Sequence, residues 1–163
     1  MTGSEIDRLA DLASAALPLW DVPPDATARL INLSENATYI VESPDGFRSV
    51  LRIHRQDYHT RRGIECELAW MEALSTTGGV ATPRPIAGHD GALIQQRGHG
   101  YLTPRRMVMF EFLQGCEPDP GDDLVLPFRQ LGAIAARTHL HSISCVKPAP
   151  FERLTWDDEE VFV

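Results

Sequence analysis

A change in hydrophobic period near residue 26 is the feature that most constrains the fold of this chain. From Ala26 to His54 apolar residues alternate with polar ones, as in strands that bury one face. The pattern predicts three strands, the first ending at Leu33, the second at 37–42 and the third at 47–54. Pro44-Asp45-Gly46, a tight-turn sequence, separates the second from the third. The segment therefore predicts an antiparallel sheet that contains a hairpin.

Helical periodicity flanks this sheet on both sides. Residues 4–17 place apolar side chains along one face, and Ser4 with Asp7 gives a capping pattern at their start. Three prolines within 18–25 predict a break and a linker. Residues 64–74 return to helical spacing, so we expect a helix after the third strand.

The second half of the chain continues the sheet and then leaves it. Short strands are expected at 83–87 and 92–95, joined by a hairpin turn at His89-Asp90-Gly91, and a mobile loop is expected at 96–106. The apolar run 107–113 is typical of a buried strand.

Beyond this run, an acidic, proline-containing linker at 117–123 precedes an amphipathic helix over 124–141. We expect an α+β fold with a five-stranded antiparallel sheet. Its three parts are an N-terminal helix and linker (1–25), the sheet with its helix (26–115), and a linker with the start of a further lobe (116–163).

Composition excludes several classes of protein. The 163 residues, 43% of them hydrophobic, are enough for a core, and the net charge of −8 argues against nucleic acids and anionic membranes as partners. Cys66, Cys116 and Cys145 are odd in number and form no Cys-x-x-Cys pair, which favours reduced thiols. The sequence contains no apolar run of about 18 residues and no signal peptide, so we expect a cytoplasmic protein.

Several local sequences, in this order, resemble the aminoglycoside phosphotransferases and the related choline and homoserine kinases. The resemblance spans about residues 30–141. The matching segments are Ser34-Glu35-Asn36-Ala37-Thr38-Tyr39, Val50-Leu51-Arg52-Ile53-His54-Arg55, Ile64-Glu65-Cys66-Glu67-Leu68-Ala69-Trp70, Met109-Phe110-Glu111-Phe112-Leu113-Gln114-Gly115 and the helix from Leu131 to His141.

The resemblance implies a phosphate-binding role for four residues. Arg52 stands where the family places a Lys or sometimes an Arg that pairs with the α- and β-phosphates of the nucleotide. Glu67 matches the helix carboxylate that orients this cation. Asn36 and Thr38 would lie under the phosphates, in a turn whose N–H groups face them.

The resemblance also implies a hinge that binds the nucleotide base. Glu111 and Leu113 would offer backbone groups to the base, and Met109 and Phe112 belong to the same segment. The family helix that ends in Leu140-His141 is structural.

The catalytic part of the family pattern does not occur in these 163 residues. The sequence contains no His-x-Asp followed five residues later by Asn, and no later metal-binding Asp, so we assign no catalytic and no metal residue. The implied cofactor is ATP or GTP with Mg, whose ligands would lie in a missing C-terminal lobe. The implied reaction is transfer of the γ-phosphate to a small-molecule hydroxyl, with this chain inactive by itself. Aminoglycosides, choline, homoserine and protein Ser or Thr all stay open as acceptors.

Two alternatives remain at this stage. The lobe could act alone as a binding or dimerisation module, with a second copy covering the apolar surface of residues 124–140. The chain could also be a generic α+β domain in which Arg52 and Glu67 form only a salt bridge.

His139 and His141 lie two apart on a helix and so make a poor metal pair.

Overall fold

The computed structural model describes residues 3–100, 103–116, 118–119, 121 and 123–153. The chain forms two compact units. The first contains Met1–His59 and Pro83–Cys116, and the second contains Thr60–Thr82 and Glu117–Val163. The predicted boundaries after residues 25 and 115 stay predictions.

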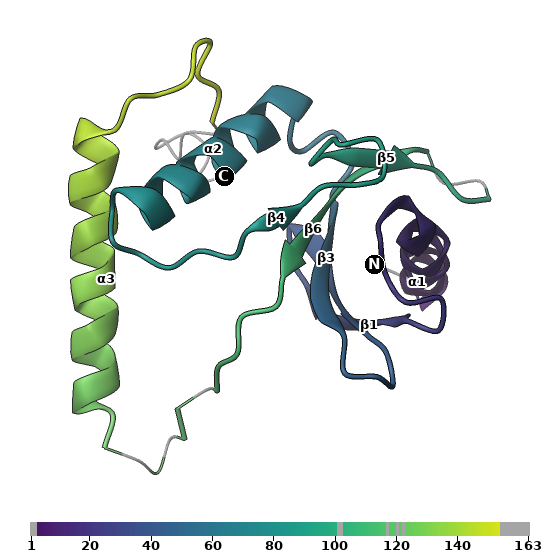
Figure 1. Cartoon of the computed structure of the whole chain (residues 1–163), viewed down its shortest axis with the longest axis horizontal. Coiled ribbons are helices and arrows are strands. Elements are labelled where there is room, and N and C mark those ends of the chain that lie inside the picture. The colour runs from purple at the N-terminus through teal and green to yellow at the C-terminus, as the bar shows by residue number, and fades with distance from the viewer. Residues whose placement is uncertain (1–2, 101–102, 117, 120, 122, 154–163) are drawn as a thin grey trace. The chain divides into compact units, whose positions relative to one another are not determined.

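The first unit is built around a six-stranded antiparallel sheet (Figure 1). Its strand order is β1-β2-β3-β6-β4, and β5 also pairs with β6. The strands are β1 (Thr27–Leu33), β2 (Asn36–Glu42), β3 (Arg48–His54), β4 (Pro85–Ile86), β5 (Gln95–Arg97) and β6 (Arg105–Glu111). The predicted α+β class is confirmed, and the three strands expected up to His54 are present.

The strand count and the second hairpin differ from the sequence prediction. The sheet has six strands where five were expected, because β4 and β5 both pair with β6 and neither forms a ladder with the other. The expected turn is present, since the Gly88 N–H donates to the Ala92 carbonyl at 2.9 Å. The expected loop at 96–106 is shorter than predicted, because β5 and β6 take its two ends.

The turn between β2 and β3 forms as its sequence predicts. The Ser43 N–H donates to the Phe47 carbonyl (3.2 Å), and Gly46 has a φ of +94°, which favours glycine. The Asp45 carboxylate accepts hydrogen bonds from the Ser43 hydroxyl and the Phe47 N–H. These hydrogen bonds stabilise the charged form and lower the pKa of Asp45 below its ordinary value of 3.8.

The N-terminal helix packs on one face of the sheet and shares its core. Helix α1 (Gly3–Ala16) leads into a short 3-10 helix, η1 (Leu17–Leu19). The buried cluster consists of Leu9, Leu12, Ala13, Ala16, Leu17 and Trp20 from this region and Ala37, Tyr39, Val41, Leu51, Ile53, Met107 and Met109 from the sheet. The Trp20 indole N–H also donates to the Ile86 carbonyl at 3.0 Å, which ties η1 to β4. The capping role predicted for Ser4 lies outside the described side chains.

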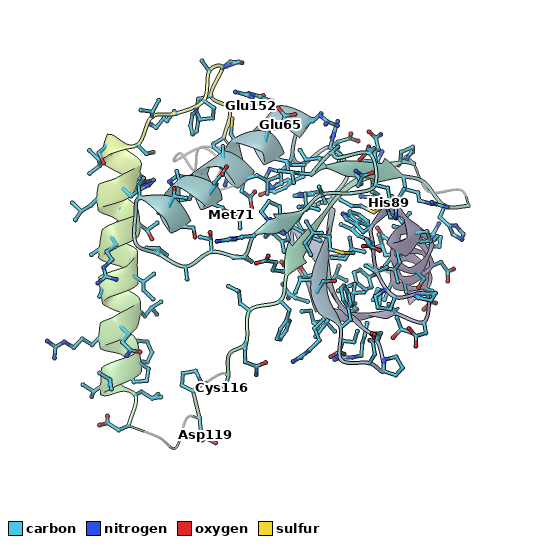
Figure 2. The ribbon with its side chains drawn as sticks, viewed as in Figure 1. Glu65, Met71, His89, Cys116, Asp119 and Glu152 are labelled. Carbon is cyan, nitrogen blue, oxygen red and sulfur yellow. The ribbon has the colours of Figure 1, made fainter. Side chains whose placement is uncertain are left out.

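The second unit contains two helices. Helix α2 (Arg61–Thr76) starts at its N-cap Thr60, whose hydroxyl accepts from the Gly63 N–H at 2.9 Å. Thr60 also hydrogen-bonds to Glu152, and Figure 2 shows Glu152 near Glu65 at this end of α2. Helix α3 (Val125–Ser144) confirms the predicted helix and extends it by three residues.

The C-terminal end of α3 packs on the turn that follows α2. His141 Nε2 lies 3.1 Å from the Thr77 hydroxyl, and its ring Cδ2 would be 3.1 Å from a Cβ added to Gly78. His141 therefore joins α3 to the turn after α2 within the second unit. None of the described helices is long and apolar enough to cross a membrane.

Helix α3 has no buried side chain along its length. Its apolar side chains are between 44% and 83% exposed. These side chains, called the α3 apolar residues below, are distributed around the helix: Val125, Leu126, Phe128, Leu131, Ile134, Leu140 and Ile143.

Candidate functional site

The candidate site is the face of the sheet that points away from α1. Register places Thr38 on β2 opposite Arg52 on β3, and Arg52 opposite Val108 on β6. The core residues that pack on α1 lie at the alternate positions of these strands. Thr38 and Arg52 therefore share one face, as their predicted common role requires.

An apolar row lies beside this polar pair on the same face. Ile40, Val50 and Phe110 stand opposite one another on β2, β3 and β6, two residues from Thr38, Arg52 and Val108. The Arg52 guanidinium carbon lies 4.8 Å from the centroid of the Phe110 ring, within cation–π range. Ile40 and Phe110 are buried, whereas Val50 and Arg52 are half-buried, so this face combines a partly accessible cation with an apolar row of which Val50 is the accessible member.

Sequence analysis did not single out this row. The sequence nevertheless indicates it. Val50 lies two residues before Arg52 and Ile40 two residues after Thr38, and residues two apart on a strand lie on the same face of a hairpin. The run 107–113 predicts a buried strand that overlaps the predicted hinge at 109–113, and this prediction does not separate the two faces of the strand.

The turn before β2 holds Asn36 in place. The Ser34 N–H donates to the Asn36 carbonyl at 3.1 Å, and the Asn36 side-chain oxygen accepts from the Arg55 N–H at 3.4 Å. Glu35 in the same turn forms an exposed ion pair with Arg55 at 3.3 Å. These contacts define the shape of the turn, and the role of Asn36 toward phosphate stays a prediction.

The predicted hinge segment follows β6 directly. β6 ends at Glu111, whose N–H donates to the Arg84 carbonyl at 2.9 Å. Among the described residues, the backbone hydrogen bonds outside helices and strands include none made by Phe112 or Leu113. Leu113 is half exposed, whereas Met109 is fully buried in the core shared with α1. The side chain of Met109 therefore lies on the face opposite Arg52.

Glu67 lies in α2 and has an ion-pair partner that the sequence did not suggest. Its Oε2 is 3.1 Å from Arg153 Nη1, and its side chain is only 18% exposed. Because 86 residues separate the two in sequence, no local pattern could have linked them. Arg52 belongs to the first compact unit and Glu67 to the second, so their predicted pairing stays a prediction.

A metal site does not emerge from the described part of the chain. Within it, no group of three or more His, Cys, Asp or Glu side chains is placed to hold a metal ion.

Comparison with known proteins identifies the family. The chain matches the Phosphotransferase enzyme family over residues 27–161. The structure is similar to that of the microcompartment-associated aminopropanol kinase, with a TM-score of 0.80 and 42% sequence identity. This alignment covers 93% of the present chain and 46% of the aminopropanol kinase chain. No curated protein sequence matches the chain.

A second solved structure shares the fold. It is that of amicoumacin kinase hAmiN in complex with AMP-PNP, Ca²⁺ and Ami, with a TM-score of 0.76 and 22% identity. The alignment covers 98% of the present chain and 48% of the amicoumacin kinase chain. The chain thus spans less than half the length of both kinases, and the predicted kinase-like lobe is confirmed. The chain belongs to the Phosphotransferase enzyme family.

Proposed function

We propose that this chain is the ATP-binding lobe of a small-molecule phosphotransferase, which transfers the nucleotide γ-phosphate to a substrate hydroxyl. The observation that carries the proposal is the sheet face on which Arg52 stands beside Thr38 and next to the row Ile40, Val50 and Phe110. Family membership supports the same assignment. We place the protein in the cytoplasm, in agreement with its three cysteines, which are all free.

The residues of this face fit a nucleotide of this kind. The guanidinium of Arg52 presents a planar fork of N–H donors that can bind two phosphate oxygens at once. The Thr38 hydroxyl lies on the neighbouring strand as a further donor. Val50, the half-buried member of the row, would contact the base, and the Glu111 carbonyl and Leu113 N–H would hydrogen-bond to its edge.

The catalytic groups would come from a further part of the protein. Both similar kinases are about twice as long as this chain. We propose that the additional part supplies the base, the Mg ligands and the groups that position the substrate. It would also cover the α3 apolar residues, since exposed apolar patches above several hundred Å² are rare in monomers.

The acceptor is proposed to be the hydroxyl of a small amino alcohol. The support is the 42% identity with a structure described as an aminopropanol kinase, over 93% of this chain. A full-length protein that phosphorylates aminopropanol, and homoserine or aminoglycosides far more slowly, would agree with this proposal. Equal rates on all three would contradict it.

Nucleotide binding tests the core of the proposal. AMP-PNP should raise the thermal midpoint of the 163-residue chain, and Arg52→Ala should weaken its binding by about 10- to 100-fold, as loss of a hydrogen bond to a charged group predicts. Arg97→Ala is the matched control, because Arg97 is an exposed arginine on β5 of the same sheet. The proposal fails if the wild-type chain does not bind millimolar AMP-PNP, or if both variants bind equally well.

A second candidate function rests on the α3 apolar residues. A stand-alone lobe could use part of this helix to dimerise, because seven apolar side chains along it are at least 44% exposed. Sedimentation of the 163-residue chain should then show a dimer that Leu131→Glu disrupts. A wild-type monomer at micromolar concentration would rule out this candidate.

A further inference from the structure

Arg48, the first residue of β3, contacts the hinge segment through its side chain. Its guanidinium carbon lies 3.8 Å from the centroid of the Phe112 ring, which is a close cation–π stack. Its Nη1 also lies 3.5 Å from Gln114 Oε1. One arginine therefore touches the residues on both sides of Leu113.

Glu42 fixes this arginine from the neighbouring strand. Glu42 Oε1 lies 3.2 Å from Arg48 Nε, and register places the two residues opposite one another on β2 and β3. Glu42 Oε2 also lies 3.5 Å from Arg29 on β1. The guanidinium is thus held against the ring of Phe112 by a carboxylate that belongs to the rigid sheet.

These contacts matter for the segment more than for the fold. The side chains of Arg48 and Glu42 are 41% and 38% exposed, and exposed ion pairs contribute little to global stability. Phe112 and Leu113, by contrast, follow the end of β6 and make none of the described backbone hydrogen bonds outside helices and strands. The ring contact and the hydrogen bond with Arg48 are therefore restraints that the sheet places on this stretch.

We infer that Arg48 is a positioning residue for base binding. By holding Phe112 and Gln114, it orders the backbone between them, so that the Leu113 N–H points in a fixed direction before the nucleotide arrives. Such pre-ordering lowers the entropy cost of binding. The inference rests on the proposed function, and Arg48 itself acts through Phe112 and Gln114. A lysine cannot replace it, because only a planar guanidinium stacks on the ring and forks to two oxygens at once.

The first test needs no nucleotide. In Arg48→Ala, amide hydrogens of residues 112–115 should exchange several-fold faster than in the wild type, with exchange in β2 and β3 unchanged. Arg29→Ala is the matched control, because Arg29 pairs with the same Glu42 but lies on β1, which β2 and β3 separate from β6 and the segment that follows it. If Arg48→Ala and Arg29→Ala exchange at equal rates in residues 112–115, the positioning role is wrong.

The second test separates the base from the phosphates. Arg48→Ala should raise the Kd for AMP-PNP by about 2- to 10-fold, the range expected for ordering one or two side chains, and leave the Kd for inorganic triphosphate unchanged. Arg48→Lys should behave like the alanine variant. A purely structural role would weaken both ligands equally, and that result would overturn the inference.

The two tests also distinguish the inference from the proposed function. Faster exchange in Arg48→Ala together with no AMP-PNP binding by the wild type would refute the proposed function, and with it the role of Arg48 in base binding. Wild-type AMP-PNP binding together with unchanged exchange in Arg48→Ala would refute the inference alone.

Discussion

Leu12 offers the sharpest test of the observation that α1 belongs to the core of the sheet. Its side chain is fully buried in the cluster formed by α1, β2, β3 and β6. Leu12→Ala removes three carbon atoms, which at about 0.8 kcal/mol each gives about 2.4 kcal/mol. Incomplete collapse of the resulting cavity adds to this, so we expect a loss of about 3 kcal/mol in the free energy of unfolding of the first unit.

Hydrogen exchange of β2 and β3 measures this loss locally, without assuming that both units unfold together. A loss of about 3 kcal/mol corresponds to roughly 150-fold faster exchange of the most protected amides. Asp11→Ala is the control, since the neighbouring Asp11 is exposed on the same helix, and it should change stability by about 0.5 kcal/mol or less. If Leu12→Ala has no larger effect than Asp11→Ala, α1 does not share the core of the sheet.

Three further predictions concern single residues. Burial raises the pKa of Tyr39 above 10.0, and within the described residues its hydroxyl has no hydrogen-bond partner, so Tyr39→Phe should not destabilise the chain at pH 7. Stability lost above about pH 10, measured by urea unfolding, should be smaller in Tyr39→Phe, because the unfolded chain releases the Tyr39 proton near pH 10 while the folded chain holds it to a higher pH. The Asp45 carboxylate should titrate below 3.8 by NMR, so the β2–β3 turn should weaken only as the pH falls through that lower value. Ser43→Ala removes a hydrogen bond to the carboxylate and should return the titration midpoint toward 3.8. Gly78→Ala should destabilise the second unit by about 1–3 kcal/mol in thermal unfolding, because the new Cβ would lie 2.9 Å from the Leu74 carbonyl oxygen. Gly132→Ala is the control: its Cβ would meet nothing within 4 Å, so it should stabilise α3 by about 0.5–1 kcal/mol.

Local patterns predicted the elements of this protein well. Alternation and the Pro44-Asp45-Gly46 turn suffice for the β2–β3 hairpin, because a period of two and a glycine at positive φ leave few other solutions. The helices α2 and α3 follow from their 3.6-residue period in the same way. Family resemblance then pointed to Arg52 and Thr38, which register does place side by side.

Long-range pairing was beyond these patterns. The short segments at 85–86 and 95–97 carry too few residues to show which strand they pair with, and both turned out to pair with β6. The contacts of Arg48 with Phe112 and of Glu67 with Arg153 join residues 64 and 86 positions apart. Such contacts depend on how the elements pack against one another, and neither periodicity nor a turn sequence encodes this packing.

The position of β6 in the sheet has a consequence for synthesis on the ribosome. β6 lies between β3 and β4, yet it is the last of the six strands in sequence. Until residue 111 leaves the exit tunnel, β3 has an open edge with unpaired backbone groups. Nascent chains of this protein should therefore remain vulnerable to aggregation or chaperone capture during the roughly 60 residues translated between β3 and the end of β6, and codons that slow this stretch should lower the soluble yield.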